Sequence, residues 1–191
     1  MANELHITGD ADADALLTTD PLALLVGMLL DQQVPMETAF AGPAKLRARL
    51  GRFDAKTIAG YEPDEFAAVM KQSPAVHRFP GSMAARVQAL CAAVVADWGG
   101  DAQAIWTTGD PDGAEILARL NALPGFGEQK AKIFLALLGK RRGLTAPGWE
   151  AAAGAYGEKD SYRSVADIVD PESLLKVRAT KQAAKAAAKG K

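Results

Sequence analysis

The sequence contains very little cysteine and histidine, and no long apolar run. Cysteine occurs once, at Cys91, and histidine twice, at His6 and His77, so one chain cannot build a disulfide, a four-cysteine iron–sulfur cluster or a Cys/His zinc site. No window reaches the roughly 18 consecutive apolar residues that a membrane span requires, and the acidic, helix-breaking start is unlike a secretory signal. We therefore expect a cytoplasmic protein with no metal site and no membrane segment.

Alternation of apolar and polar residues with period two is also missing over any length that would indicate a strand. Apolar residues recur instead at helical spacing, as in residues 81–100, where Cys91 is expected to be buried. Asp20 and Pro21 are typical of a helix start, whereas Pro43 is expected to break or restart the helix that precedes it. The pattern predicts an all-α fold.

The formal net charge of −1 conceals an uneven distribution of charge. Residues 1–75 carry eleven Asp and Glu against six Lys and Arg, while residues 176–191 carry only basic charges. The near-neutral balance argues against strong non-specific nucleic-acid binding but leaves room for local basic patches. We expect an acidic N-terminal segment over 1–16, a helical domain over 17–175 and a basic, frayed tail over 176–191.

A glycine-rich turn, NALPGFGEQK at residues 121–130, separates two apolar helical runs in a unit that spans 114–139. Gly125 and Gly127 permit positive φ and remove side chains where a ligand can approach the backbone. The free N–H groups at the start of the second helix favour an anion, and phosphate is the natural one. A plain helix–helix turn with Phe126 as its apolar plug explains the same spacing, so both interpretations stay open on spacing alone.

The segment LPGFG, followed by Ala131, resembles the helix-hairpin-helix motif of the HhH-GPD superfamily of base-excision DNA glycosylases. Residues 28–40, MLLDQQVPMETAF, are similar to the superfamily's ILxQQ(V/T)S helix end, and FPGSMAARVQAL resembles another of its helices more loosely. The resemblance spans roughly residues 20–150. It implies a helical bundle of two lobes with a cleft between them.

The resemblance also implies a set of DNA contacts. The hairpin's N–H groups would bind a phosphate of duplex DNA, often with a monovalent cation at the loop and no other cofactor, and the glutamines would fill the gap left by an extruded base. The residues implicated are Gly125, Phe126, Gly127, Lys130, Lys132, Lys140, Gln32 and Gln33. We expect a monomer that is nucleoid-associated when it is on DNA.

Two departures from the family bear on chemistry. Gln129 stands where bifunctional members keep a Schiff-base lysine, and Lys130 is turned about 100° away from that position, so we expect no strong β-lyase activity. The catalytic Asp of most members would fall at Pro147, and no aspartate lies between Asp112 and Asp160. The nearest carboxylate in sequence is Glu150.

Three carboxylates could replace the missing Asp. Glu150 is the first candidate, Asp31 beside the glutamines is the second, and Asp160 is a distant third. Glycosidic cleavage develops positive charge on the sugar, and a preorganised anion lowers the barrier by roughly a few kcal/mol. Trp149 is the candidate for the base pocket, ahead of Trp106 and Tyr156, and His77 could bind a phosphate but is more often structural.

These observations support two functional hypotheses. The first is a monofunctional DNA N-glycosylase with water as the nucleophile, acting on alkylated bases because a cationic leaving group needs less help from a carboxylate. The second is a non-catalytic lesion- or structure-specific DNA-binding protein of the same fold, which the missing Asp favours. Fold resemblance alone does not establish catalysis.

Overall fold

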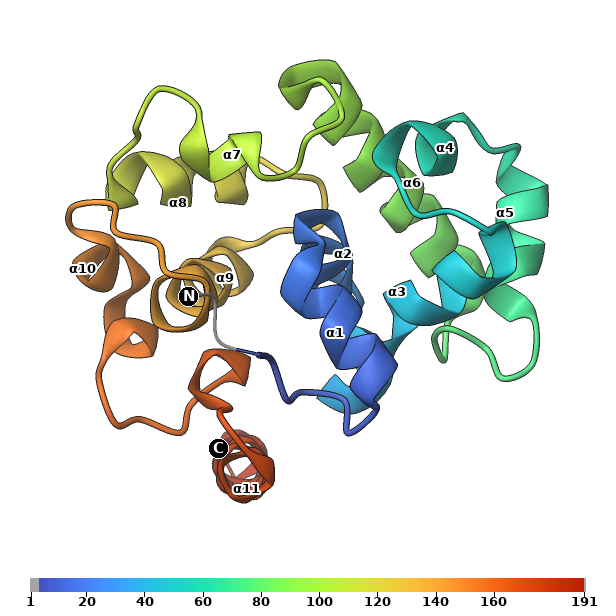
Figure 1. Cartoon of the computed structure of the whole chain (residues 1–191). Helices are drawn as coiled ribbons and strands as arrows, with labels where there is room; N and C mark the ends of the chain where they lie inside the picture. The colour runs from blue at the N-terminus through green and yellow to red at the C-terminus, as the bar shows by residue number, and fades with distance from the viewer. Residues whose placement is uncertain (1–3, 191) are drawn as a thin grey trace.

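A computed structural model describes residues 4–190, and over that range its regular elements are all helices, with no strand, which confirms the predicted all-α class (Figure 1). In chain order the elements are α1 (Ala11–Thr19), α2 (Pro21–Leu30), α3 (Met36–Leu50), α4 (Ala55–Gly60), α5 (Pro63–Lys71), α6 (Pro80–Trp98), α7 (Ala104–Thr107), α8 (Gly113–Asn121), α9 (Glu128–Arg141), α10 (Trp149–Ala153), the short 3₁₀ helices η1 (Gly154–Gly157) and η2 (Val165–Asp167), and α11 (Pro171–Lys189).

Helix α2 forms the centre of the core. All of its residues after Pro21 are buried, and the helix contacts α1, α3, α6 and α9. Its predicted start is confirmed: the Asp20 carboxylate accepts hydrogen bonds from the N–H groups of Leu22 and Ala23. Burial raises the pKa of Asp20, although these two hydrogen bonds act to lower it. Gly27 allows α3 to approach, since a Cβ there would lie 2.5 Å from the Phe40 ring.

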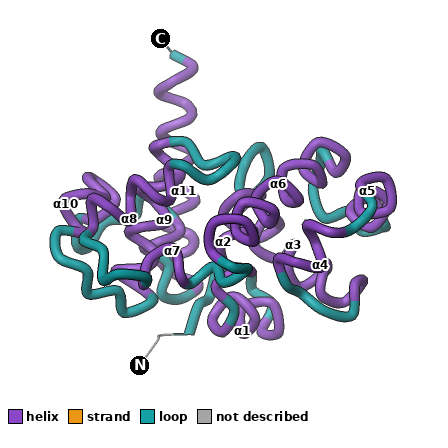
Figure 2. The backbone as a smooth tube through the Cα atoms, turned by 90° about the horizontal axis from the view of Figure 1, so that it is seen from above, coloured by secondary structure: helices purple, strands orange, loops and turns teal. Residues whose placement is uncertain are grey.

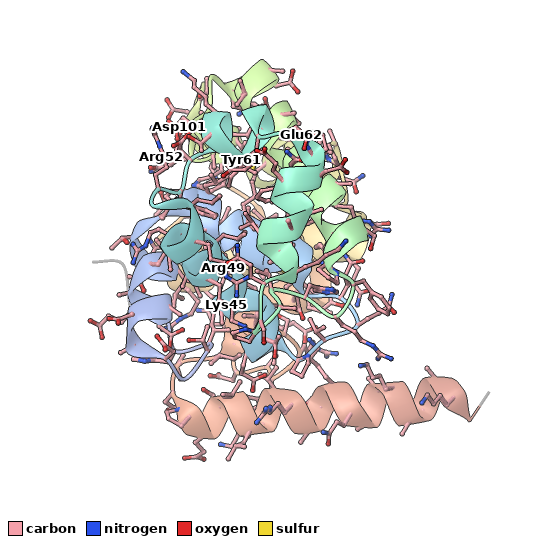
Figure 3. The ribbon with its side chains drawn as sticks, turned by 90° about the vertical axis from the view of Figure 1, so that its right-hand side faces the viewer. Lys45, Arg49, Arg52, Tyr61, Glu62 and Asp101 are labelled. Carbon is pink, nitrogen blue, oxygen red and sulfur yellow. The ribbon has the colours of Figure 1, made fainter. Side chains whose placement is uncertain are left out.

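Helix α3 runs without interruption through Pro43, so the predicted break there is wrong. Pro43 is buried, and α3 packs against both α1 and α2, which holds the helix together across the lost N–H. The same helix anchors the loop after α5 through two basic side chains labelled in Figure 3. Arg49 donates to the carbonyls of Val69 and Pro74, and Lys45 donates to that of Ala75.

The remaining helices gather on the two sides of α2. Helices α4, α5 and α6 pack together on one side, and α8, α9 and α10 pack together on the other. Cys91 on α6 is fully buried, as expected, and burial raises its pKa to about 12. The division into two lobes with a cleft between them stays a prediction.

The two ends of the described chain differ: residues 4–10 form a loop that precedes α1, and α11 runs to Lys189. The acidic start packs onto the core through the buried side chains of Leu5 and Ile7. At the other end, α11 crosses the predicted boundary at 175/176 without a break and projects past the body of the molecule (Figures 2 and 3). The proposed domain boundaries themselves stay predictions.

Within residues 4–190, no individual helix has the length and apolar composition to cross a membrane. The pair α1 and α2 meets those two criteria only when taken together, with a bend of 115° between them.

Candidate functional site

The turn between α8 and α9 has the geometry of a tight glycine hairpin. Gly125 has φ +81°, and a Cβ there would lie 2.4 Å from the Leu29 side chain of α2. Gly127 begins α9 with φ −78° and has open space around its Cα. Phe126, between the two glycines, is buried, and its ring packs edge-on against the Phe134 ring with 6.0 Å between the ring centroids. It is the apolar plug that the sequence predicted for this turn.

The first turn of α9 is an open N-terminus. Among residues 4–190, no side chain caps this helix start by accepting a hydrogen bond from its N–H groups, which leaves them able to bind an anion. Glu128 lies in this turn and pairs with Lys132 at 2.6 Å. The hydrogen bond from Lys132 holds the pKa of Glu128 below its ordinary value. Lys132, expected to contact a phosphate, is therefore engaged on its own helix.

Lys130 joins the hairpin to the end of α2. Its Nζ donates to the carbonyls of Met28 at 2.6 Å, Asp31 at 3.2 Å and Leu29 at 3.4 Å. These carbonyls lie at the C-terminus of α2, where a cation is favourable. Burial lowers the pKa of Lys130 from 10.5 to about 8. A lysine with such a pKa is a better nucleophile, but its amine is directed into the end of α2.

The loop that follows α2 is held from several sides. The Gln32 amide donates to the Leu29 carbonyl and accepts a hydrogen bond from Arg86 at 2.8 Å. His77 is buried; its Nδ1 accepts from the Phe79 N–H, so its Nε2 donates to the Gln32 carbonyl. Gln33 is exposed and has φ 59°, a left-handed conformation that is uncommon outside glycine. His77 therefore has a structural contact with the glutamine segment.

Asp31 and Gln129 line a common pocket, which we call the Asp31 pocket. Its volume is 380 Å³, and it is lined by Asp31, Gln129, Ile133, Ala155, Tyr156, Arg163, Ser164, Val165, Thr180, Lys181, Ala184 and Lys185. The Gln129 amide donates to the Tyr156 hydroxyl at 2.9 Å. The Asp31 side chain is 9% exposed and faces Lys181 at 3.6 Å.

Trp149 and Glu150 lie elsewhere. Trp149 packs directly against Gly113 and Gly139. A Cβ at Gly113 would lie 2.4 Å from the Trp149 Cα, and a Cβ at Gly139 would lie 2.5 Å from the Trp149 ring. Trp149 thus joins α10 to α8 and α9. Glu150 is exposed and, with Trp149, lines a separate pocket of 450 Å³. The structure does not bring either residue to the Asp31 pocket.

The same separate pocket contains Lys140 and Asp160. Lys140 pairs at 2.6 Å with Asp167, whose side chain is 4% exposed. Asp167 also accepts hydrogen bonds from Ser161 and from the N–H of Arg163. Lys140, expected as a phosphate partner, therefore serves a buried network that the sequence did not predict.

The sequence also missed the residues that α11 contributes. Lys181 and Lys185 line the Asp31 pocket, although they belong to the segment expected to fray. The only sequence signal for them was the uniform basic charge of residues 176–191. No group of three or more His, Cys, Asp or Glu residues with metal-binding geometry occurs within residues 4–190.

Two helices joined by a glycine loop with an open helix N-terminus define a helix-hairpin-helix protein. The model of the HhH-GPD superfamily base excision DNA repair proteins matches residues 26–188. The chain belongs to this family, and its function therefore lies in base excision DNA repair, with DNA as the substrate. No curated protein and no solved structure gives a significant match to the chain.

The lowered pKa of Lys130 predicts a specific dependence of stability on pH. The pKa is about 8 in the folded protein and about 10.4 in an unfolded chain. Between these values the unfolded chain binds more protons, so the free energy of unfolding rises with pH over this window. Lys130→Met lacks this titration. Urea unfolding at several pH values should show the wild type gaining stability relative to the variant between about pH 8 and about pH 10; a constant difference would contradict the burial of the amine.

The conformation of Gln33 gives a second prediction. Glycine adopts positive φ without the cost of roughly 1 kcal/mol that other residues incur. Gln33→Gly should therefore be more stable than Gln33→Ala by about 1 kcal/mol in thermal unfolding. If Gln33 contacts DNA, both variants should lose the same affinity for a lesion-containing duplex. Equal stabilities would show that the loop relaxes, and unchanged affinity would remove Gln33 from the DNA interface.

Proposed function

We propose that the protein is a monofunctional N-glycosylase that removes alkylated bases from duplex DNA, working as a monomer in the cytoplasm at the nucleoid. The observation that carries this proposal is the Asp31 pocket. It places a little-exposed carboxylate in the same pocket as Gln129, the residue at the family's lyase position. A carboxylate beside Gln129, which stands in place of the family's lyase lysine, suits hydrolysis by water.

In the proposed reaction, Asp31 acts on the water and on the sugar. The C1′–N bond breaks and its electron pair leaves with the base, while positive charge develops on the sugar. The Asp31 carboxylate stabilises that charge and accepts a proton from the water that adds to C1′. Gln129 and Tyr156 carry an amide and a hydroxyl that can hydrogen-bond the extruded nucleotide. Asp31 takes this role in preference to Glu150, which does not line the pocket.

The choice of alkylated bases rests on the leaving group. A base that already carries positive charge departs without protonation, so the pocket needs no general acid on the base side. The side chains of Ile133 and Val165 provide apolar surface for such a base.

The hairpin is the proposed binding site for the DNA backbone. The open N–H groups of α9 would bind one phosphate, and Gly127 leaves room for it. We also propose a monovalent cation at the loop. Within the described residues, no N–H or side chain donates to the carbonyls of Pro124 and Gly125, which fits such a cation.

The experiment is a lesion panel. Duplexes with one alkylated, deaminated or oxidised base are incubated with the protein, and abasic sites are then cleaved by alkali. We expect release of alkylated bases, strand cleavage only after alkali, and no covalent adduct on borohydride treatment. An adduct at Lys130 or at another lysine would contradict the monofunctional assignment. Activity confined to oxidised bases would contradict the lesion class.

The second candidate, a non-catalytic lesion-binding protein, is favoured by one observation. Lys181 faces the Asp31 carboxylate at 3.6 Å and offsets its charge. Under this alternative, the same panel would show selective binding of a lesion and no base release on any duplex.

A further inference from the structure

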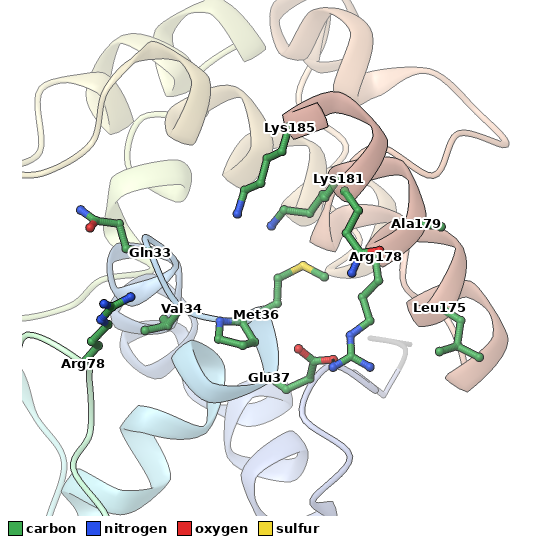
Figure 4. A pocket seen from close by; sticks show the side chains of 12 residues that line it. Gln33, Val34, Met36, Glu37, Arg78, Leu175, Arg178, Ala179, Lys181 and Lys185 are labelled. Carbon is green, nitrogen blue, oxygen red and sulfur yellow. Dashed lines mark ion pairs between the residues drawn. The ribbon is translucent and has the colours of Figure 1, made fainter. Parts of the chain in front are cut away.

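Helix α11 presents one basic face toward the glutamine loop. Arg178, Lys181 and Lys185 are spaced by three and four residues, so their side chains share that face. Figure 4 shows Arg178, Lys181 and Lys185 extending from α11 toward the segment that carries Gln33 and Glu37. Lys176 differs from these three because it pairs with Glu172 on its own helix and lies over the Tyr162 ring.

A groove lies between this face and the segment that leads from α2 into α3, and we call it the α11 groove. Its volume is 790 Å³, and it is lined by Gln33, Val34, Pro35, Met36, Glu37, Arg78, Leu175, Arg178, Ala179, Lys181, Gln182 and Lys185. Four of these side chains are basic, and Glu37 is the only acidic one. Lys181 and Lys185 also line the Asp31 pocket, so the groove and the pocket adjoin.

Two ion pairs hold α11 across this groove. Arg178 lies 2.7 Å from the Glu37 carboxylate and Lys181 lies 3.6 Å from that of Asp31. Arg178 and Lys181 keep 47% and 37% of their side chains exposed, and pairs with exposed cations are weak. Lys185 has no ion-pair partner within residues 4–190. These cations are therefore able to exchange their partners for a stronger anion.

The attachment of α11 to the body is otherwise slight. Its buried residues are Ser173 and Val177, both in its first half. In the second half, Lys181 and Lys185 extend toward the body (Figure 4), and the helix itself projects beyond the body (Figure 3). A helix held in this way can adjust its position when a polyanion enters the groove.

We propose that α11 is a second DNA-binding element, in which Lys181 and Lys185 bind phosphates on the far side of the Asp31 pocket from the hairpin. This inference rests on the proposed function and names a second contact surface for the same DNA. A phosphate that takes Lys181 frees the Asp31 carboxylate. Loading of DNA on α11 thereby uncovers the group that acts on the sugar, which couples DNA binding to activation of the pocket.

The test is the salt dependence of DNA binding by the full-length protein. Each phosphate contact contributes about 0.9 to the slope of log K against log salt concentration for B-DNA. The magnitude of this negative slope should therefore be smaller by about 2 in the variant Lys181→Gln/Lys185→Gln than in the wild type. Arg178 is left in place because it is the ion-pair partner of the largely buried Glu37 carboxylate, at 2.7 Å. Loss of Arg178 would leave that charge uncompensated. The probe is a fluorescent duplex with one abasic-site analogue.

The control removes the same charge outside the groove. Lys56→Gln/Lys176→Gln should leave the slope within about 0.5 of wild type. A slope for Lys181→Gln/Lys185→Gln equal to that of the control would overturn the role of α11 while leaving the hairpin and the pocket unaffected. Absence of DNA binding by the wild-type protein would instead overturn the proposed function as well. Lys185→Gln alone provides a variant whose fold is not at risk, because Lys185 has no ion-pair partner within residues 4–190. The magnitude of its salt-dependence slope should decrease by about 0.9.

Discussion

Asp31→Asn is expected to slow base release by hundreds-fold in a single-turnover assay on an alkylated duplex. The substitution keeps the shape of the side chain but removes the anion that opposes the charge developing on the sugar, which is worth roughly a few kcal/mol in a preorganised site. The Asp31 side chain is 9% exposed, so solvent screens that charge only partly. DNA affinity should not fall, because the substitution releases Lys181 from its ion pair with Asp31 at 3.6 Å and leaves the ammonium group available to a phosphate.

Glu150→Gln is the matched control for this result. Glu150 is exposed and lines the pocket that contains Trp149, not the one that contains Asp31. Its rate should equal that of the wild type. If instead Glu150→Gln lost activity and Asp31→Asn kept it, Glu150 would be the catalytic carboxylate, as the sequence analysis first suggested.

Gly127→Ala is expected to reduce affinity for duplex DNA by at least about tenfold without changing stability. The φ of −78° at Gly127 suits alanine, and no atom lies within 4 Å of the Cβ that alanine would add. The free energy of unfolding should stay within about 0.5 kcal/mol of wild type. The added methyl group would lie where a phosphate must approach the α9 N–H groups, so binding alone is affected.

Two further glycine variants sharpen this measurement. Gly125→Ala requires a left-handed residue and places a Cβ 2.4 Å from Leu29, so it should lose both stability and DNA affinity. Gly60→Ala, in α4, also adds a methyl group in open space and should change neither. Unaltered affinity for Gly127→Ala in fluorescence anisotropy would mean that the hairpin is a plain turn.

Local signals made several elements predictable from sequence. The start of α2 follows from Asp20 and Pro21, and the hairpin follows from Gly125 and Gly127, because capping and positive φ are properties of a few adjacent residues. Pro43 shows the limit of such rules. Its helix continues because the tertiary contacts of α3 outweigh one lost hydrogen bond.

The candidate site was less predictable, because its members are brought together from distant parts of the chain. Counting along the hairpin located Gln129, but its pocket neighbours Tyr156 and Lys181 come from η1 and α11. The position of Trp149 depends on two glycines in α8 and α9 that admit its backbone and ring. No local pattern around Trp149 reports that contact.

The contact of Trp149 with α8 and α9 limits how the proposed active site could be redesigned. An ungapped count from Gln129 puts the position of the family's catalytic Asp at Pro147, whose carbonyl accepts a hydrogen bond from the Gly113 N–H at 2.8 Å. Pro147 lines neither the Asp31 pocket nor the α11 groove. A Pro147→Asp graft would therefore add a carboxylate beside the contact of α8 with α10 and outside the Asp31 pocket. If the Asp31 pocket is the active site as proposed, a carboxylate from the segment between α9 and α10 would reach it only along a different backbone path.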